Sequence, residues 1–332
     1  MENFTKILAI NFGGIGDEIL FLPTLISLKK EFPNSEITLA LEPRSKSIKD
    51  LTDVIDKIAL VDIKNKNKYV ELIKFIFKSR FANYDIGISA GANKFMSIIL
   101  WLCGIKKRYG YDTGALSRIL LTQAVKLNKN QYAAKMYHDL AKPLTDNVTE
   151  LPQINAETGE KIPNSVLIHP GVSQMSLKKG IVKTITPKIW ADTIKLLLEN
   201  GKKVILAGGP DDDKCIKEIL ESCPDIEKNT NFENVYGRTK NLKELAVLIG
   251  KAERFLCSDS APLHIAVALG VETYAIFGPT DDKKLIPPTV KAIKANDCCE
   301  LKPCLWEKRQ TSCPTLECLK ITPKDIINII CG

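Results

Sequence analysis

The sequence contains no apolar run of the ~20 residues that a helix needs to span a bilayer. It also lacks a secretory signal, because its acidic first residues lead at once into a strand-like run at residues 7–10. No short repeat occurs, and no recognisable nucleic-acid-binding module surrounds the basic residues. These absences predict a cytoplasmic protein that neither spans a membrane nor binds nucleic acid.

The composition is that of an ordinary folded protein, with 45% hydrophobic and 26% charged residues. A chain of 332 residues is longer than a typical domain with a single hydrophobic core, so we expect two domains. A polar stretch with two prolines, residues 145–164, is the predicted linker between them.

Short apolar runs alternate with segments of helical spacing on both sides of this linker. Helical spacing occurs, for example, in residues 20–32 and 93–103. The predicted strands are residues 6–12, 36–42, 57–63, 84–90, 165–171, 202–210, 254–260 and 272–279. This alternation is typical of parallel sheets with helices on both faces. It predicts an α/β protein made of two Rossmann-like domains that face each other across a cleft.

A glycine-rich loop, "NFGGIGDEILFLP" at residues 11–23, follows the first predicted strand. Gly13, Gly14 and Gly16 would let the backbone approach a phosphate at a helix start. Asp17 and Glu18 come next, however, and two carboxylates there would repel a phosphate.

A dinucleotide loop needs Gly-x-Gly-x-x-Gly and an acid ~20 residues further on. Glu42 stands near that position, so a nicotinamide-dependent oxidoreductase is one alternative.

Three glycine-containing turns follow predicted strands in the second half, in "HPGVS" (169–173), "AGGP" (207–210) and "FGPT" (277–280). Ligands bind at that edge of an open α/β sheet. Asp259 and Ser260 also follow a strand there, ahead of a helix that carries His264. The start of this helix could offer N–H groups to a diphosphate. The acidic triplet 211–213 fits first-turn carboxylates better than a metal site.

Four features of the sequence, in their order along the chain, resemble glycosyltransferase family 9, the ADP-heptose transferases of lipopolysaccharide synthesis. They are residues 7–43, "HPGVS", a lysine ahead of "TPKIW", and residues 236–280. The resemblance is weakest over residues 100–164. Two features depart from the family's pattern: Ala261 stands where glycine is common, and the stretch between Ser173 and the lysine is longer.

The resemblance implies a GT-B fold and a division of labour between its domains. An acceptor-binding domain would span residues 1–155 and a nucleotide-sugar domain residues 165–321, with a C-terminal helix, 322–332, packing back toward the first domain. The donor would be ADP-heptose and the acceptor the lipopolysaccharide core or another glycan. Asp17 would be the general base of an inverting transfer, on the acceptor-side loop of Gly13, Gly14 and Gly16.

The resemblance also implies a donor site. Lys183 would stabilise the leaving diphosphate, in preference to Lys178, Lys179 or Lys188. The donor-binding residues would be Ser173, Asp259, Ser260, Ala261 and His264. No metal or other cofactor is then required for catalysis. Another nucleotide sugar and a protein acceptor are alternatives within this class.

The net charge of +8 is concentrated in a lysine-rich stretch at residues 63–81. As a helix from Tyr69, this stretch would place Leu72, Ile73, Ile76 and Phe77 on one apolar face. Either that face packs on the core and the lysines are solvated, or Lys74, Lys78 and Arg80 contact an anionic inner-membrane surface or a phosphorylated partner.

Five of the ten cysteines, Cys298, Cys299, Cys304, Cys313 and Cys318, lie within 21 residues. Their spacing is looser than the paired C-x-x-C of a zinc ribbon. Four thiolates around a structural Zn or Fe ion, from Cys299, Cys304, Cys313 and Cys318, are one interpretation, and free thiols are the other. A non-catalytic metal or iron–sulfur protein is the corresponding alternative function.

Overall fold

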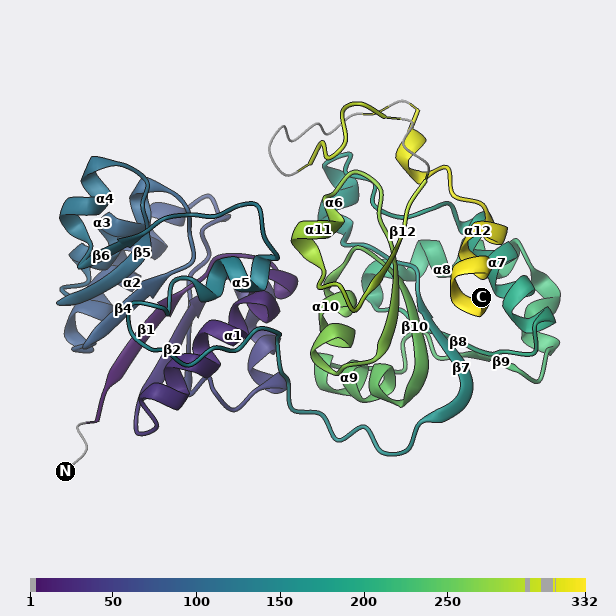
Figure 1. Ribbon diagram of the computed structural model, residues 1–332, viewed down its shortest axis with the longest axis horizontal. Coiled ribbons are helices and arrows are strands. Elements are labelled where there is room, and N and C mark those ends of the chain that lie inside the picture. The colour runs from purple at the N-terminus through teal and green to yellow at the C-terminus, as the bar shows by residue number, and fades with distance from the viewer. Residues whose placement is uncertain (1–3, 296–298, 306–312, 314) are drawn as a thin grey trace. The chain divides into compact units, whose positions relative to one another are not determined.

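The computed structural model describes residues 4–295, 299–305, 313 and 315–332. The chain forms two compact units, Met1–Asn155 and Ala156–Gly332. Each unit contains one parallel six-stranded sheet with helices packed on it (Figure 1). The α/β class predicted from the alternation of strands and helices is therefore confirmed.

The first unit has the strand order β3-β2-β1-β4-β5-β6. Its strands are β1 (Lys6–Ile10), β2 (Glu36–Leu41), β3 (Lys57–Leu60), β4 (Ile86–Ser89), β5 (Lys107–Tyr111) and β6 (Gln123–Val125). Its helices are α1 (Ile15–Glu31), η1 (Pro43–Leu51), α2 (Lys68–Phe81), α3 (Lys94–Leu102), α4 (Ala115–Leu120) and α5 (Ala133–His138). Strand β1 is central and apolar on both faces because helices cover both of them. The direction of the strand order reverses between β1 and β4.

Helices α2, α3 and α4 follow right-handed crossovers in one direction and so lie on one face of this sheet. Phe75, Ile99 and Leu121 join Leu8 in a buried cluster there. Helix α1 packs with η1 and α5.

Of the two interpretations of residues 63–81, the one in which Ile73 and Phe77 pack on the core is wrong, because they are 66% and 65% exposed. Apolar residues run around most of α2, and only one side of a helix can face the sheet.

The first part of the predicted linker belongs to the first unit. Thr149 is buried and accepts a hydrogen bond from Ser27 of α1 at 3.0 Å. Ser27 Oγ also lies 2.9 Å from Nε2 of His138, so three segments meet at this point. Strand β7 begins at Ile162, three residues ahead of the predicted strand, which makes the connection shorter than the polar composition suggests.

The second unit has the strand order β12-β11-β10-β7-β8-β9. Its strands are β7 (Ile162–His169), β8 (Lys203–Leu206), β9 (Phe232–Asn234), β10 (Ala252–Ser258), β11 (Glu272–Ile276) and β12 (Lys291–Ile293). Its helices are α6 (Gln174–Lys178), α7 (Pro187–Glu199), η2 (Pro210–Asp212), α8 (Asp213–Glu221), η3 (Pro224–Lys228), α9 (Leu242–Lys251), α10 (Ala261–Ala268), α11 (Asp282–Leu285), η4 (Glu317–Leu319) and α12 (Pro323–Cys331). The strand order reverses here between β7 and β10.

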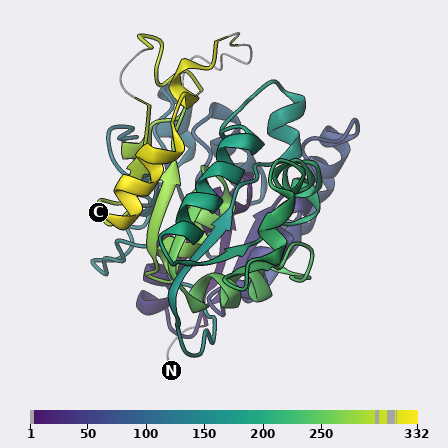
Figure 2. The ribbon, with the colours of Figure 1, turned by 90° about the vertical axis from the view of Figure 1, so that its right-hand side faces the viewer.

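The C-terminal helix α12 lies alongside α7, as Figure 2 shows. Ile326 and Ile330 are buried in one cluster with Trp190 and Ile194 of α7. The helix starts with a capping box, in which Thr322 donates its backbone N–H to Asp325 at 3.0 Å. Its core contacts are therefore with its own unit, and packing toward the first domain stays a prediction.

Candidate functional site

The glycine-rich loop connects β1 to α1 at the point where the first sheet reverses its strand order. A Cβ atom on Gly13 would lie 2.3 Å from Cβ of Asp17, so only glycine fits there. Oδ2 of Asp17 accepts the backbone N–H of Gly14 at 2.8 Å. The acid therefore folds back over the first turn of its own helix, and its side chain is only partly buried.

Tyr137 of α5 is the second group at this carboxylate. Its hydroxyl donates to Oδ1 of Asp17 at 3.5 Å, and its ring meets Phe21 of α1 edge-on with a centroid distance of 5.8 Å. Burial and the charge of Asp17 raise the pKa of Tyr137. No sequence pattern pointed to Tyr137, because it lies in the stretch where the resemblance to the family is weakest.

Glu18 differs sharply from its neighbour Asp17. Its side chain is fully buried, and neither carboxyl oxygen makes a well-formed hydrogen bond. Burial, and then the charge of Asp17, raise its pKa well above the ordinary value. Of the two adjacent acids, Asp17 is thus the one whose side chain a ligand can reach.

The residues that follow β2 lie next to the glycine-rich loop. Ser45 Oγ donates to the carbonyl of Gly13 at 3.2 Å, and Arg44 guanidinium nitrogens lie 3.9 Å from where a Cβ of Gly14 would be. Glu42, the acid on which the oxidoreductase alternative depends, is 2% exposed and accepts from Arg44 at 2.7 Å and Lys64 at 2.8 Å. Glu42 is therefore engaged in ion pairs, which leaves the oxidoreductase alternative without its key residue.

Lys183 and Asp259 come together in the second unit, where its strand order reverses. Nζ of Lys183 donates to the backbone carbonyl of Asp259 at 2.7 Å and to Oδ2 at 3.2 Å. Thr280, which follows β11, donates to the same Oδ2 at 2.8 Å. Asp259 is 3% exposed, whereas the Lys183 side chain is 20% exposed, so the ammonium group lies at the edge of the unit with a fixed partner.

A network of hydroxyl groups holds the segment that carries Lys183. Thr184 Oγ1 accepts from Ser258 at 2.7 Å and from the indole N–H of Trp190 at 3.0 Å, and it donates to the carbonyl of Pro170 at 2.7 Å. These bonds tie the segment ahead of α7 to the ends of β7 and β10. The predicted lysine is thereby held next to the ends of these two strands.

The remaining predicted donor-site residues have different surroundings. Ser260 occupies the N-cap of α10, and Ala261 is the first residue of that helix. Ser173 is exposed at the start of α6. His264 is 4% exposed, so its ring lies within the unit.

A buried histidine–aspartate pair, which sequence analysis missed, lies behind the "HPG" turn. His169 Nε2 is 3.5 Å from Oδ2 of Asp212, which also accepts the N–H of Gly209 at 2.8 Å. Burial lowers the pKa of His169 and raises that of Asp212. A Cβ on Gly171 would lie 1.6 Å from this carboxylate, so the turn requires glycine. The triplet 211–213 therefore contributes to the fold, as its position in a first turn suggests.

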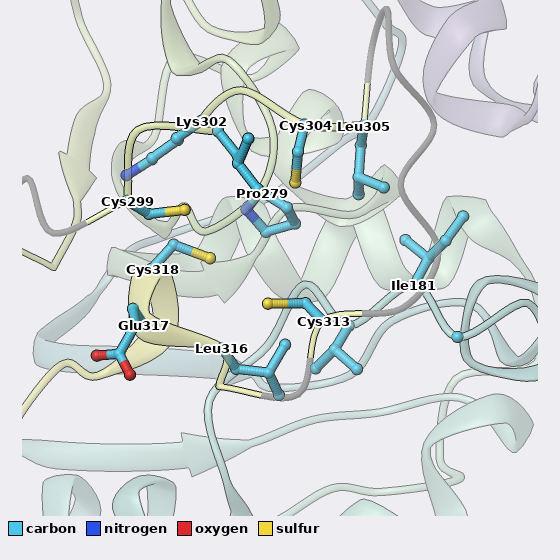
Figure 3. A pocket seen from close by; sticks show the side chains of 13 residues that line it. Ile181, Pro279, Cys299, Lys302, Cys304, Leu305, Cys313, Leu316, Glu317 and Cys318 are labelled. Atoms are coloured by element: carbon cyan, nitrogen blue, oxygen red, sulfur yellow. The ribbon is translucent and has the colours of Figure 1, made fainter.

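Four of the clustered thiols, Cys299, Cys304, Cys313 and Cys318, line one pocket beside Pro279 (Figure 3). Its volume is about 40 Å³, which is room for one ion or water. Burial and the neighbouring thiols raise the pKa of Cys318, while backbone N–H groups lower that of Cys313. Cys298 lies outside the described residues. In the part of the chain that the structure describes, no three His, Cys, Asp or Glu side chains form a group that could hold a metal as it stands.

Comparison with known proteins identifies the family. The sequence model described as glycosyltransferase family 9 (heptosyltransferase) matches residues 74–313, more than two thirds of the chain. The chain belongs to glycosyltransferase family 9. A family 9 glycosyltransferase is an enzyme that transfers a sugar, which confirms the resemblance and the enzyme class predicted from the sequence.

Individual relatives agree with this assignment. The chain is 26% identical over 283 residues to lipopolysaccharide heptosyltransferase 3 of Escherichia coli, covering 80% of this chain and 81% of that protein. The structure of E. coli ADP-heptose lipopolysaccharide heptosyltransferase II matches with a TM-score of 0.73 at 19% identity, over 98% and 97% of the two chains. E. coli heptosyltransferase WaaC with ADP-2-deoxy-2-fluoro heptose also gives 0.73, at 17% identity over 98% and 99%. The fold of this glycosyltransferase is therefore GT-B.

Proposed function

We propose that this glycosyltransferase moves a heptose from ADP-heptose to the lipopolysaccharide core or a related glycan. The observation that carries the proposal is the family match over residues 74–313, together with relatives named for this reaction. The structures of similar fold include one with an ADP-heptose analogue, which supports ADP-heptose as donor. A different nucleotide sugar or a protein acceptor is the competing form of the proposal.

Asp17 is the general base in this proposal. The acceptor hydroxyl oxygen bonds to the anomeric carbon, the bond from that carbon to the diphosphate breaks, and Asp17 takes the hydroxyl proton. Attack from the face opposite the leaving group inverts the anomeric configuration. The partial exposure of Asp17 and the absence of side chains on Gly13 and Gly14 support this role, because an acceptor can approach the carboxylate closely.

Lys183 meets the negative charge that grows on the leaving diphosphate. Its fixed contact with Asp259 keeps the ammonium group at the sheet edge where ligands bind. Backbone N–H groups at Ser260 and Ala261, and the hydroxyl of Ser173, would complete the phosphate contacts, with His264 behind them. With these groups in place the chemical step uses no metal.

Deletion of the gene tests the acceptor. We expect lipopolysaccharide from the deletion strain to lack one heptose by mass spectrometry, and the purified enzyme with ADP-heptose to restore that mass in vitro. Restoration by a UDP- or GDP-sugar instead would replace the donor in this proposal. Unchanged lipopolysaccharide with a changed glycoprotein mass would replace the acceptor.

We also propose that Cys299, Cys304, Cys313 and Cys318 hold one structural Zn or Fe ion. Their convergence on one small pocket supports this, because thiolates are the ligands that such ions prefer. The ion would clamp the segment that precedes η4 and α12.

Replacing Cys304 and Cys313 by Ser should therefore release the metal and lower the melting temperature by several degrees. Elemental analysis of anaerobically purified protein should find about one metal per wild-type chain. A Cys331→Ser variant, altered at an exposed thiol of α12, should keep its metal. Substoichiometric metal in the wild type would contradict the site.

A further inference from the structure

Helices α2, α3 and α4 lie on one face of the first sheet and carry many large apolar side chains that are exposed to solvent. We call this surface the outer apolar face. Its members are each between 38% and 75% exposed: Tyr69, Val70, Ile73, Phe77, Phe81, Phe95, Trp101, Leu102, Leu116 and Ile119. So many exposed apolar side chains on three neighbouring helices mark an interaction site, since isolated exposed residues are normal but clusters are not.

Positive charge surrounds the same three helices. Residues 64–122 contain eleven Lys and Arg against three Asp and Glu, a net charge of +8 that equals that of the whole chain. The one acid on α2, Glu71, is paired with Lys74 at 3.0 Å. Lys78 and Lys94 are exposed beside the apolar residues. A partner that covers this face must therefore offer both an apolar layer and negative charge.

Interspersed lysines and aromatic residues distinguish a bilayer from a protein partner. Lysine is depleted in protein–protein interfaces, whereas lysine stems bury along apolar surface while their ammonium groups reach headgroups. Tyr and Trp, present here as Tyr69 and Trp101, are enriched at the membrane–water boundary. We propose that the outer apolar face docks on the surface of a bilayer that contains anionic lipids.

The face would lie in the plane of the bilayer surface. Helices α2, α3 and α4 contain 14, 9 and 6 residues, fewer than the ~20 that a span requires. Among the described residues, no helix has the length and apolar composition to cross a bilayer. Docking would hold the first unit at the surface of an anionic bilayer, independently of which sugar the enzyme transfers.

Vesicle sedimentation without donor or acceptor tests this docking. We expect the wild type to bind phosphatidylcholine vesicles containing phosphatidylglycerol, to bind pure phosphatidylcholine weakly, and to dissociate as salt rises toward ~0.5 M. An Ile73→Ser/Phe77→Ser variant should lose most binding, and its exposed sites leave the core intact. A Lys74→Gln/Lys78→Gln/Lys94→Gln variant should bind on the order of 10²-fold more weakly to the anionic vesicles.

The matched control removes three lysines from the second unit, in Lys214→Gln/Lys217→Gln/Lys228→Gln, and should bind as the wild type does. Bromine-labelled lipid should quench Trp101 fluorescence, and Trp101→Phe should remove that quenching. Equal binding by the two triple-lysine variants, or no binding by the wild type, would overturn the proposal. A third contradicting result would be a wild type that does not bind vesicles but forms concentration-dependent dimers, if Ile73→Ser/Phe77→Ser abolishes those dimers. The outer apolar face would then be the interface with a second copy of this chain.

Discussion

The Asp17→Asn variant should lose turnover by on the order of 10²-fold or more while it binds ADP with unchanged affinity. Asparagine keeps the size of the side chain and an oxygen that can accept the N–H of Gly14, so the start of α1 is preserved. What it removes is the proton acceptor. Steady-state transfer from ADP-heptose, with calorimetric titration of ADP, measures both quantities.

Asp325→Asn is the matched control, because Asp325 also accepts a backbone N–H in a capping box, at the start of α12. It should leave turnover near the wild-type value. Wild-type turnover in Asp17→Asn would make Asp17 a capping acid only. If Glu18→Gln lost turnover in its place, the base would be the buried neighbour.

The Lys183→Ala variant should lose both turnover and affinity for ADP, with turnover falling on the order of 10²-fold. The ammonium group would no longer meet the charge of the leaving diphosphate. Asp259 keeps its hydrogen bond from Thr280 at 2.8 Å, so the carboxylate is not left without a donor. Transfer rates and calorimetric ADP titration of the same preparation provide the measurement.

Lys188→Ala provides the comparison, since Lys188 is an exposed lysine of α7 paired with Asp192 at 3.1 Å. We expect it to act as the wild type in both assays. Unchanged ADP binding together with normal turnover in Lys183→Ala would move the role to another lysine. Lys183→Arg, which keeps the charge, should recover part of the ADP affinity if charge is what the diphosphate requires.

The fold was largely predictable because its signals are local. Apolar runs and helical spacing repeat along the chain, and each predicted strand lies at a strand of the structure, for example residues 6–12 at β1 and 254–260 at β10. The linker was placed less well. Composition marks residues 145–164 as polar, but only packing shows that Thr149 is bound to α1.

The candidate site was predictable where glycine and a functional side chain lie close in the sequence. Gly13 and Asp17 are four residues apart, and the absence of a side chain on one makes room for the other. The contact of Lys183 with Asp259 spans 76 residues, and that of Tyr137 with Asp17 spans 120. Such pairs depend on strand order, which no local pattern encodes.

By itself the sequence determined two α/β halves and an acid behind a glycine-rich loop at a sheet edge. It located strands β1–β4, β7, β8, β10 and β11, but not the short strands β6, β9 and β12 or the strand β5. The tertiary structure alone decided which of two adjacent acids is accessible. Successive helical residues point about 100° apart, so Asp17 lies over the helix start while Glu18 turns into the core. The tertiary structure also decided that Ile73 and Phe77 are exposed, because only one side of helix α2 can pack against the sheet. The spacing of apolar residues shows which of them share a face of a helix. Whether those side chains are buried depends on a neighbouring element that covers the face.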